Sequence, residues 1–401
     1  MINSTGPISL SGTTAGQSIA LELEQADATA ISLNDTTVRT LANKLLTNET
    51  ISFFDFYNKT GVIINGSTVA AAGAFGIAIS PDGLHVYVTN VSSNTLSSFS
   101  RDTTTGGLTL IGTSATGVSP AFVAISPDGA SVYVTNATSA TVSLYIRNRS
   151  TGVLTINGKI STGITTLRPR PIVISGDGKN VYVGNVGTGT AGVLYCYTRN
   201  AILNTLTWHN STGATAPTGI AIAPNGVAIY ALNGNANASY QLTAFARTST
   251  GVVATVLSSV LLSTTTYSAI DIVIVPDSTY AYVLLYYNTP VLTTKYAQVV
   301  GISLDPVTGA IIGWSQRSIA ATTDPGAMAI SPDGNSLYIA SGKNGTNRLD
   351  AYTIAANTLL IRSSIKFNYN ASPSRVAVSP DGTSVYVTDM INNTISMYHN
   401  I

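Results

Sequence analysis

A twelve-residue phrase recurs along this chain at nearly constant spacing, and this repeat limits the fold more strongly than any other feature. Residues 79–90 read ISPDGLHVYVTN, and residues 125–136 read ISPDGASVYVTN. Five further copies begin at residues 174, 222, 274, 330 and 378, so the successive spacings are 46, 49, 48, 52, 56 and 48 residues. A period of this length predicts an array of small supersecondary units that each pack against their neighbours.

Each unit is predicted to consist of four short β-strands. Apolar residues alternate in Val86-Tyr87-Val88, as in strands, and Ser-Pro-Asp-Gly combines residues that favour a tight turn. In the second unit the segments AFVAIS, SVYVTN, TVSLYIRN and VLTING follow one another, separated by turn residues. Four strands in roughly 48 residues are typical of one propeller blade. We therefore predict an all-β fold, a seven-bladed β-propeller over residues 60–401.

Two repeated features indicate how the blades pack. The first strand of each unit is almost entirely apolar and rich in small residues, which predicts an inner strand beside a central channel. The second strand carries a tyrosine at one fixed position in all seven units, and this predicts packing between neighbouring blades. These tyrosines are Tyr87, Tyr133, Tyr182, Tyr230, Tyr282, Tyr338 and Tyr386.

The ends of the chain predict how the ring closes. The seventh unit stops after its third strand, TISMYHNI, and no fourth strand follows it. Residues 60–66 read TGVIING and resemble the fourth strand of the second unit, TGVLTING at 151–158. We expect this N-terminal strand to complete the last blade, because an unpaired edge strand invites aggregation.

The phrases SPDG and VYVTN, which recur in seven exact or degenerate copies, resemble the YVTN β-propeller family. The resemblance implies an architecture shared with surface-layer proteins, with propellers related to 6-phosphogluconolactonase, and more distantly with WD40-like propellers. It covers residues 60–401 and is specific for the fold, whereas propellers support many unrelated activities.

Residues 1–59 fall outside the repeat and predict a small α+β segment. Asn34 or Asp35 can cap a helix that carries apolar residues at 38, 41 and 45. The sequence ISLND…VRTLA…ISFFDFYNK resembles a short module near the start of bacteriophage tail and fibre proteins. That resemblance implies a virion-attachment module at residues 1–59. The candidate attachment residues are Phe53, Phe54, Phe56 and Tyr57.

The join of such a module to a charge-poor propeller predicts a non-enzymatic virion protein of the tail, fibre or baseplate. Its expected partners are other virion proteins bound through residues 1–59 and a host-surface glycan or protein. A homo-oligomer in the virion is compatible with this hypothesis. The chain begins without a recognisable signal peptide, so we expect assembly in the host cytoplasm. The alternatives are a propeller hydrolase of the lactonase type and a surface-layer-like protein.

Few residues indicate chemistry. Only 9% of residues are charged and the formal net charge is +1, so we expect neither nucleic-acid binding nor membrane insertion. The three histidines occupy non-equivalent positions and are expected at the surface, and no spacing predicts a metal site or a cofactor. The repeated aspartates are explained by their turns. Among the inner strands, only Asp271, Arg375 and the nearby Arg168 and Arg170 carry charge. So few ionisable residues do not favour acid–base catalysis.

Overall fold

The structure is a computed structural model of the 401-residue chain, and it contains no helix among the residues that it describes. It describes residues 63–70, 72–162, 168–187, 192–213, 217–234, 240–263, 267–287, 296–318, 325–342, 348–355, 358–366 and 372–400. The predicted N-terminal helix and the four candidate attachment residues lie outside these ranges.

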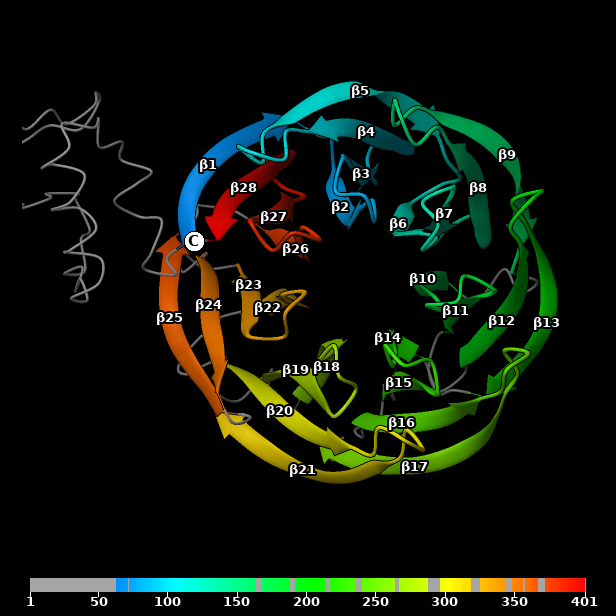
Figure 1. The fold of residues 1–401 in the computed structure, drawn as a ribbon, viewed down its shortest axis with the longest axis vertical. Coiled ribbons are helices and arrows are strands. Elements are labelled where there is room, and N and C mark those ends of the chain that lie inside the picture. The colour runs from blue at the N-terminus through cyan, green and yellow to red at the C-terminus, as the bar shows by residue number, and fades with distance from the viewer. Residues whose placement is uncertain are drawn as a thin grey trace, which may run out of the picture. The chain divides into compact units, whose positions relative to one another are not determined.

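The described strands form seven four-stranded antiparallel sheets, each of which is one blade (Figure 1). Blade 1 contains β2 (Ala74–Ile79), β3 (His85–Asn90), β4 (Thr95–Arg101) and β5 (Leu108–Ala115); blade 2 contains β6 (Pro120–Ile125), β7 (Ser131–Asn136), β8 (Thr141–Arg147) and β9 (Leu154–Ser161). Blade 3 contains β10 (Arg168–Ile174), β11 (Asn180–Val186), β12 (Gly192–Asn200) and β13 (Thr205–Gly213); blade 4 contains β14 (Pro217–Ile222), β15 (Ala228–Gly234), β16 (Tyr240–Arg247) and β17 (Val253–Ser263).

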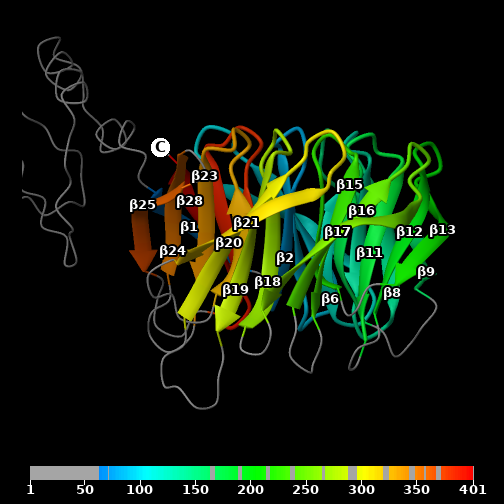
Figure 2. The same ribbon diagram turned by 90° about the horizontal axis from the view of Figure 1, so that it is seen from below.

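Blade 5 contains β18 (Tyr267–Ile274), β19 (Tyr280–Tyr287), β20 (Tyr296–Leu304) and β21 (Ile311–Ser318); blade 6 contains β22 (Pro325–Ile330), β23 (Ser336–Ser341), β24 (Arg348–Ala355) and β25 (Thr358–Lys366). Blade 7 contains β26 (Pro373–Val378), β27 (Ser384–Asp389), β28 (Thr394–Asn400) and β1 (Ile63–Ala70). The first strand of each blade lies innermost and the fourth lies at the rim, and Figure 2 shows the blades side by side. The predicted all-β seven-bladed propeller is therefore confirmed.

The N-terminal strand completes the last blade, as the sequence predicts. The order in this sheet is β1-β28-β27-β26, so β1 covers the edge that the third strand would otherwise expose (Figure 1). Because a sheet edge carries unpaired backbone donors and acceptors, this pairing satisfies those groups along the outer edge of β28 and gives blade 7 the same four strands as the other blades.

The repeated tyrosines are buried between blades. All seven have no exposed surface, and six belong to hydrophobic clusters that join two neighbouring blades. Tyr386 of blade 7, for example, packs with Phe99 and Val88 of blade 1. The prediction of inter-blade packing is confirmed, and these buried rings leave no face for stacking on a ligand.

Four arginines add charged contacts to the seams between blades. Each stands at or near the end of the third strand of its blade, and each pairs with the turn aspartate of the preceding blade at N–O distances of 2.7 to 2.9 Å. The pairs are Arg101–Asp381, Arg147–Asp82, Arg199–Asp128 and Arg247–Asp177. The turn role that the sequence suggests for these aspartates is thus incomplete, because each also anchors the next blade.

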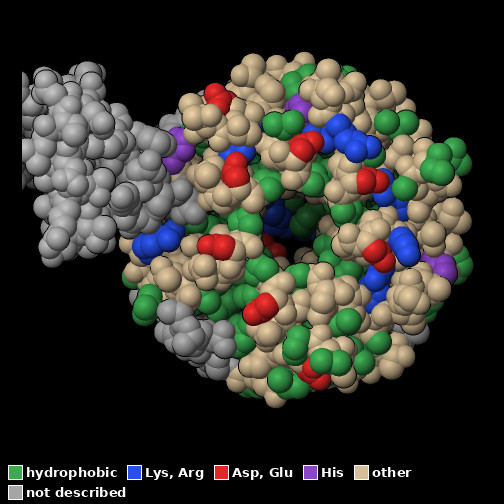
Figure 3. All heavy atoms as spheres, in the orientation of Figure 1, with side chains coloured by type: hydrophobic (Ala, Val, Ile, Leu, Met, Phe, Trp, Pro, Cys, Tyr) green, Lys and Arg blue, Asp and Glu red, His purple; other side chains and the backbone are tan. Residues whose placement is uncertain are grey.

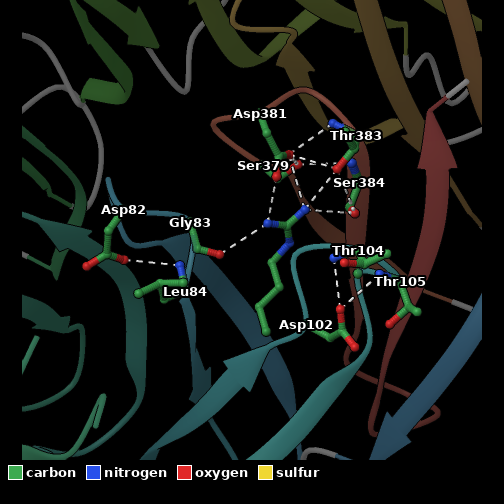
Figure 4. Close-up of polar contacts among 12 residues, drawn as sticks. Asp82, Gly83, Leu84, Asp102, Thr104, Thr105, Ser379, Asp381, Thr383 and Ser384 are labelled. Atoms are coloured by element: carbon green, nitrogen blue, oxygen red, sulfur yellow. Dashed lines mark hydrogen bonds and ion pairs between the residues drawn. The ribbon is translucent and has the colours of Figure 1, made fainter. Parts of the chain in front are cut away.

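The pair Arg101–Asp381 joins the first and the last blade. Asp381 accepts hydrogen bonds from Ser379 and Thr383 within its own turn, as Figure 4 shows, and from both terminal nitrogens of Arg101. Arg101 Nε donates to the hydroxyl of the buried Tyr386 at 2.9 Å. The arginine therefore ties the turn, the tyrosine and the next blade into one network beside the closing strand.

Candidate active site

Every inner strand carries a β-bulge near its first residues, at the end opposite the Ser-Pro-Asp-Gly turn. The register between the inner and second strands shifts at this point in all seven blades. A bulge opposes two residues to one, and it redirects the side chains that follow. The bulges thus determine which side chains of the inner strands lie at this end of the channel.

The residue four positions before the turn's first residue varies from blade to blade, and the seven positions hold six residue types. In blade order these residues are Gly76, Phe122, Pro171, Gly219, Asp271, Ala327 and Arg375. The turn end, in contrast, repeats the same residue types around the ring. Figure 3 shows the ring hollowed at its centre, with charged side chains inside the opening. One acid and one base from blades 5 and 7 therefore occupy equivalent positions beside the channel.

Arg375 is held from four directions. Its guanidinium carbon lies 4.3 Å from the ring centre of Phe122 and 5.3 Å from that of Phe75. The two rings meet edge to face at 6.1 Å. Nη1 donates to the carbonyl oxygens of Gly326, at 3.2 Å, and Ser374, at 2.9 Å. These contacts come from blades 1, 2, 6 and 7, so the arginine bridges a wide arc of the channel wall.

Asp271 is half-buried and has a perturbed protonation equilibrium. One carboxylate oxygen accepts the backbone N–H of Met328 at 3.1 Å, and the other accepts that of Ile272 at 2.9 Å. Burial raises the pKa of Asp271, while the charge of Arg375 and the two backbone hydrogen bonds oppose that rise. A carboxyl whose pKa is raised toward neutrality is suited to accept and return a proton.

The acid and the arginine act on each other without touching. Burial lowers the pKa of Arg375, the charge of Asp271 raises it, and the nearby Arg170 lowers it further. No hydrogen bond or ion pair joins the described side chains of Asp271 and Arg375. Both side chains keep partial exposure, and Arg170 is exposed. Arg375 is therefore not neutralised by a direct contact with Asp271.

Threonines of the VYVTN phrase position the bulges of blades 7, 1 and 2. Thr388 Oγ1 accepts the N–H of Arg375 at 3.1 Å and donates to the carbonyl of Phe75, in the next blade, at 2.6 Å. Thr135 likewise accepts the N–H of Phe122 and donates to the carbonyl of Arg170. The hydroxyls therefore link the backbones that carry the arginine and both rings.

The sequence predictions for this site divide into three groups. Asp271, Arg375 and Arg170 lie at one end of the channel. The sequence suggested that these charges are too few for catalysis. No side-chain position is described for Arg168. Phe75 and Phe122 were missed, because nothing in a single strand shows that rings from blades 1 and 2 converge on an arginine from blade 7. The expected surface position of His85 is wrong, since it is 4% exposed and its Nδ1 lies 2.6 Å from Arg147 Nη2.

The described residues contain no group of three or more His, Cys, Asp or Glu residues that could hold a metal ion. None of the described segments is a helix long and apolar enough to span a membrane.

The sequence matches one family model. Residues 47–167, which include β1 and blades 1 and 2, match the model described as "Lactonase, 7-bladed beta-propeller". No curated protein matches the chain. The first part of this propeller is therefore similar to that family.

Solved structures confirm the propeller architecture. Hydrazine synthase from Kuenenia stuttgartiensis is 21% identical over 84% of this chain and 98% of that chain, with a TM-score of 0.66. A putative 6-phosphogluconolactonase from Bacteroides fragilis is 17% identical over 77% and 84% of the two chains, with a TM-score of 0.56. The periplasmic gluconolactonase of Pseudomonas aeruginosa is 16% identical over 73% and 84%, with a TM-score of 0.57. At these identities the likeness shows the fold alone.

These comparisons overturn one prediction and leave others without support. The prediction of a non-enzymatic protein is contradicted by the lactonase family match and by the lactonases among the similar structures. A count of charged residues in single strands does not show that Asp271 and Arg375 lie at the same end of the channel, and for this reason it predicts too little chemistry there. The comparisons give no support to a phage module or a virion role. The predicted partners and location stay predictions, and the candidates Phe53, Phe54, Phe56 and Tyr57 lie outside the described residues.

Proposed function

We propose that the protein is a hydrolase that opens lactones at the Asp271–Arg375 end of the channel. One observation carries the proposal: an acid with a raised pKa and a rigidly held arginine share this end without pairing with each other. The lactonase family match over residues 47–167 supports it, as do the lactonases of similar fold. Propellers of this shape support many unrelated activities, so the family match rather than the shared fold favours lactone hydrolysis.

The reaction requires a base and an electrostatic partner for the developing charge. Asp271 takes a proton from water as the water oxygen attacks the lactone carbonyl carbon. The carbonyl electron pair moves onto its oxygen, and the positive charge of Arg375 stabilises this oxyanion. Collapse of the intermediate breaks the bond to the ring oxygen, which takes the proton back from Asp271. The product is an open-chain hydroxy acid.

The test is hydrolysis of a lactone panel by the purified protein, followed through the acid released. The panel contains glucono-δ-lactone, its 6-phosphate and a simple γ-lactone, each measured against spontaneous hydrolysis. We expect Asp271→Asn to lower kcat/KM about 100-fold or more, because the amide cannot accept the proton. The matched control is Asp277→Asn, in the same blade but at the exposed turn end, and it should keep full activity.

Two outcomes would contradict the proposal. One is a wild-type protein that hydrolyses none of these lactones faster than buffer does. The other is turnover that survives Asp271→Asn, which would place the chemistry elsewhere.

A further inference from the structure

The hydrogen-bond donors of Arg375 are only partly used. Both bonds of Nη1 go to carbonyl oxygens, those of Gly326 and Ser374. Nε is buried without a partner, and the hydrogen bonds described for Arg375 leave Nη2 without one as well. A buried donor without an acceptor destabilises the folded state, so its presence calls for an explanation.

The surroundings of the guanidinium edge that carries Nε and Nη2 favour an anion. Phe75 and Phe122 cover the guanidinium with apolar rings, which strengthens any charge interaction beside them. Arg170 adds positive charge that Arg375 senses. The Nε and Nη2 donors lie side by side in one plane, and two oxygens of a carboxylate or of a phosphate match that geometry. Of these two anions, the carboxylate is the one that lactone opening produces.

We propose that Arg375 binds the carboxylate of an open-chain hydroxy acid at this end of the channel. The identity of the acid rests on the proposed function, because opening a lactone produces this class of compound. The carboxylate supplies acceptors to the two donors that the protein leaves unsatisfied. The site therefore retains its product, and the free acid competes with the lactone.

The neighbouring acid gives binding a definite pH dependence. Asp271 acts on Arg375 from blade 5, and Arg170 acts on it from blade 3. When Asp271 is ionised it repels a carboxylate, and when it is protonated it can donate a hydrogen bond to one. Since its pKa is raised above the ordinary value, binding of the acid should tighten as the pH falls toward that pKa.

The experiment is isothermal titration calorimetry of the full chain with gluconate, and with sorbitol as a neutral compound of the same length. We expect saturable binding of gluconate and none of sorbitol. Arg375→Met should weaken gluconate binding at least 10-fold. Arg149→Met is the matched control, because Arg149 is an exposed arginine on the turn side of blade 2, and it should bind as the wild type does.

A variant of opposite sign separates this inference from damage to the fold. Asp271→Asn removes the repelling charge, so it should bind gluconate several-fold more tightly at pH 7 while losing lactone turnover. Equal binding of gluconate and sorbitol would overturn the inference, and so would unchanged binding by Arg375→Met or weaker binding by Asp271→Asn. If gluconate binds as expected and no lactone is hydrolysed, the proposed function fails and the carboxylate site stands.

Discussion

The two ends of the inner strands differ in how their residues repeat. At the turn end, serine, proline, aspartate and glycine recur around the ring, and four of the aspartates pair with arginines of the next blade. At the bulge end, six residue types occupy the seven equivalent positions, and the aspartate (Asp271) and the arginine (Arg375) each occur once. Residues that recur in every blade hold the blades together, whereas a residue found in one blade is available for chemistry.

The contacts between neighbouring blades at the turn end also differ from one seam to another. The described residues place an arginine–aspartate pair at the seams 7–1, 1–2, 2–3 and 3–4. At the seam between blades 4 and 5, Asn225 replaces the turn aspartate and donates to the carbonyl of Pro306 instead. Hydrophobic packing around Tyr230 continues across that seam. Burial is therefore the common element of the seams, and the ion pairs strengthen some of them.

The largest effect on stability is expected at the closing seam. Arg101 has no exposed side-chain surface, and Asp381 is 38% exposed. Removing one partner of such a pair leaves the other charge and the Tyr386 hydroxyl without their contact. We expect Arg101→Met to lower the free energy of unfolding by about 2–3 kcal/mol, less than for a fully buried pair. Urea unfolding measures this loss, and an unchanged midpoint would show that β1 alone closes the ring.

Acid should weaken the same seams. Burial alone would raise the pKa of Asp177, but hydrogen bonds from Ser175 and Arg247 outweigh it and lower the pKa to about 2. The carboxylate thus adds stability above its unfolded pKa of about 3.9, and this contribution disappears as the pH falls through the folded value.

The matching variant isolates that contribution. Asp177→Asn should be less stable than the wild type at pH 7, and the difference in unfolding free energy should shrink between about pH 4 and pH 2. Thermal unfolding across that range measures it. A difference that stays constant with pH would remove the ion pair from the account.

A smaller effect is expected at the bulge of blade 7. Thr388→Val keeps the shape of the side chain but removes the hydroxyl that holds the backbone of Arg375 and Phe75. We expect a loss of about 1 kcal/mol in unfolding free energy, together with weaker gluconate binding. Thr113→Val, at an exposed position of the outer strand β5, is the control and should change neither property. Equal effects from both substitutions would mean that the bulge hydroxyl has no special role.

Much of the fold could be predicted because its signals are local and repeated. Alternation around Tyr87, the turn residues and the strand at 60–66 each depend on a few neighbouring residues. The seam arginines were missed although they carry a signal, since each stands at or near the end of a third strand and the four recur at spacings of 46, 52 and 48 residues. They are Arg101, Arg147, Arg199 and Arg247. Pairing this position with the turn of the preceding blade requires the geometry of the ring.

The channel site could be predicted only in part. Asp271 and Arg375 stand out in the sequence because, apart from the two arginines of β10, the other inner strands lack charge. Their meeting with Phe75 and Phe122 depends on the bulges, and a shift of one residue in a strand sends a side chain to the opposite face. No pattern within a single strand reports such a shift, so the sequence indicated the charges but not the site they form.

The central claim is that the turn end of the inner strands stabilises the ring and the bulge end carries the chemistry. The most direct test measures lactone turnover and urea unfolding on one preparation of Asp271→Asn. Because burial raises the pKa of Asp271, its ionised carboxylate opposes folding at pH 7. We therefore expect turnover to fall about 100-fold or more while the free energy of unfolding stays the same or rises. Retained turnover, or a loss of stability comparable to that of Arg101→Met, would contradict the account.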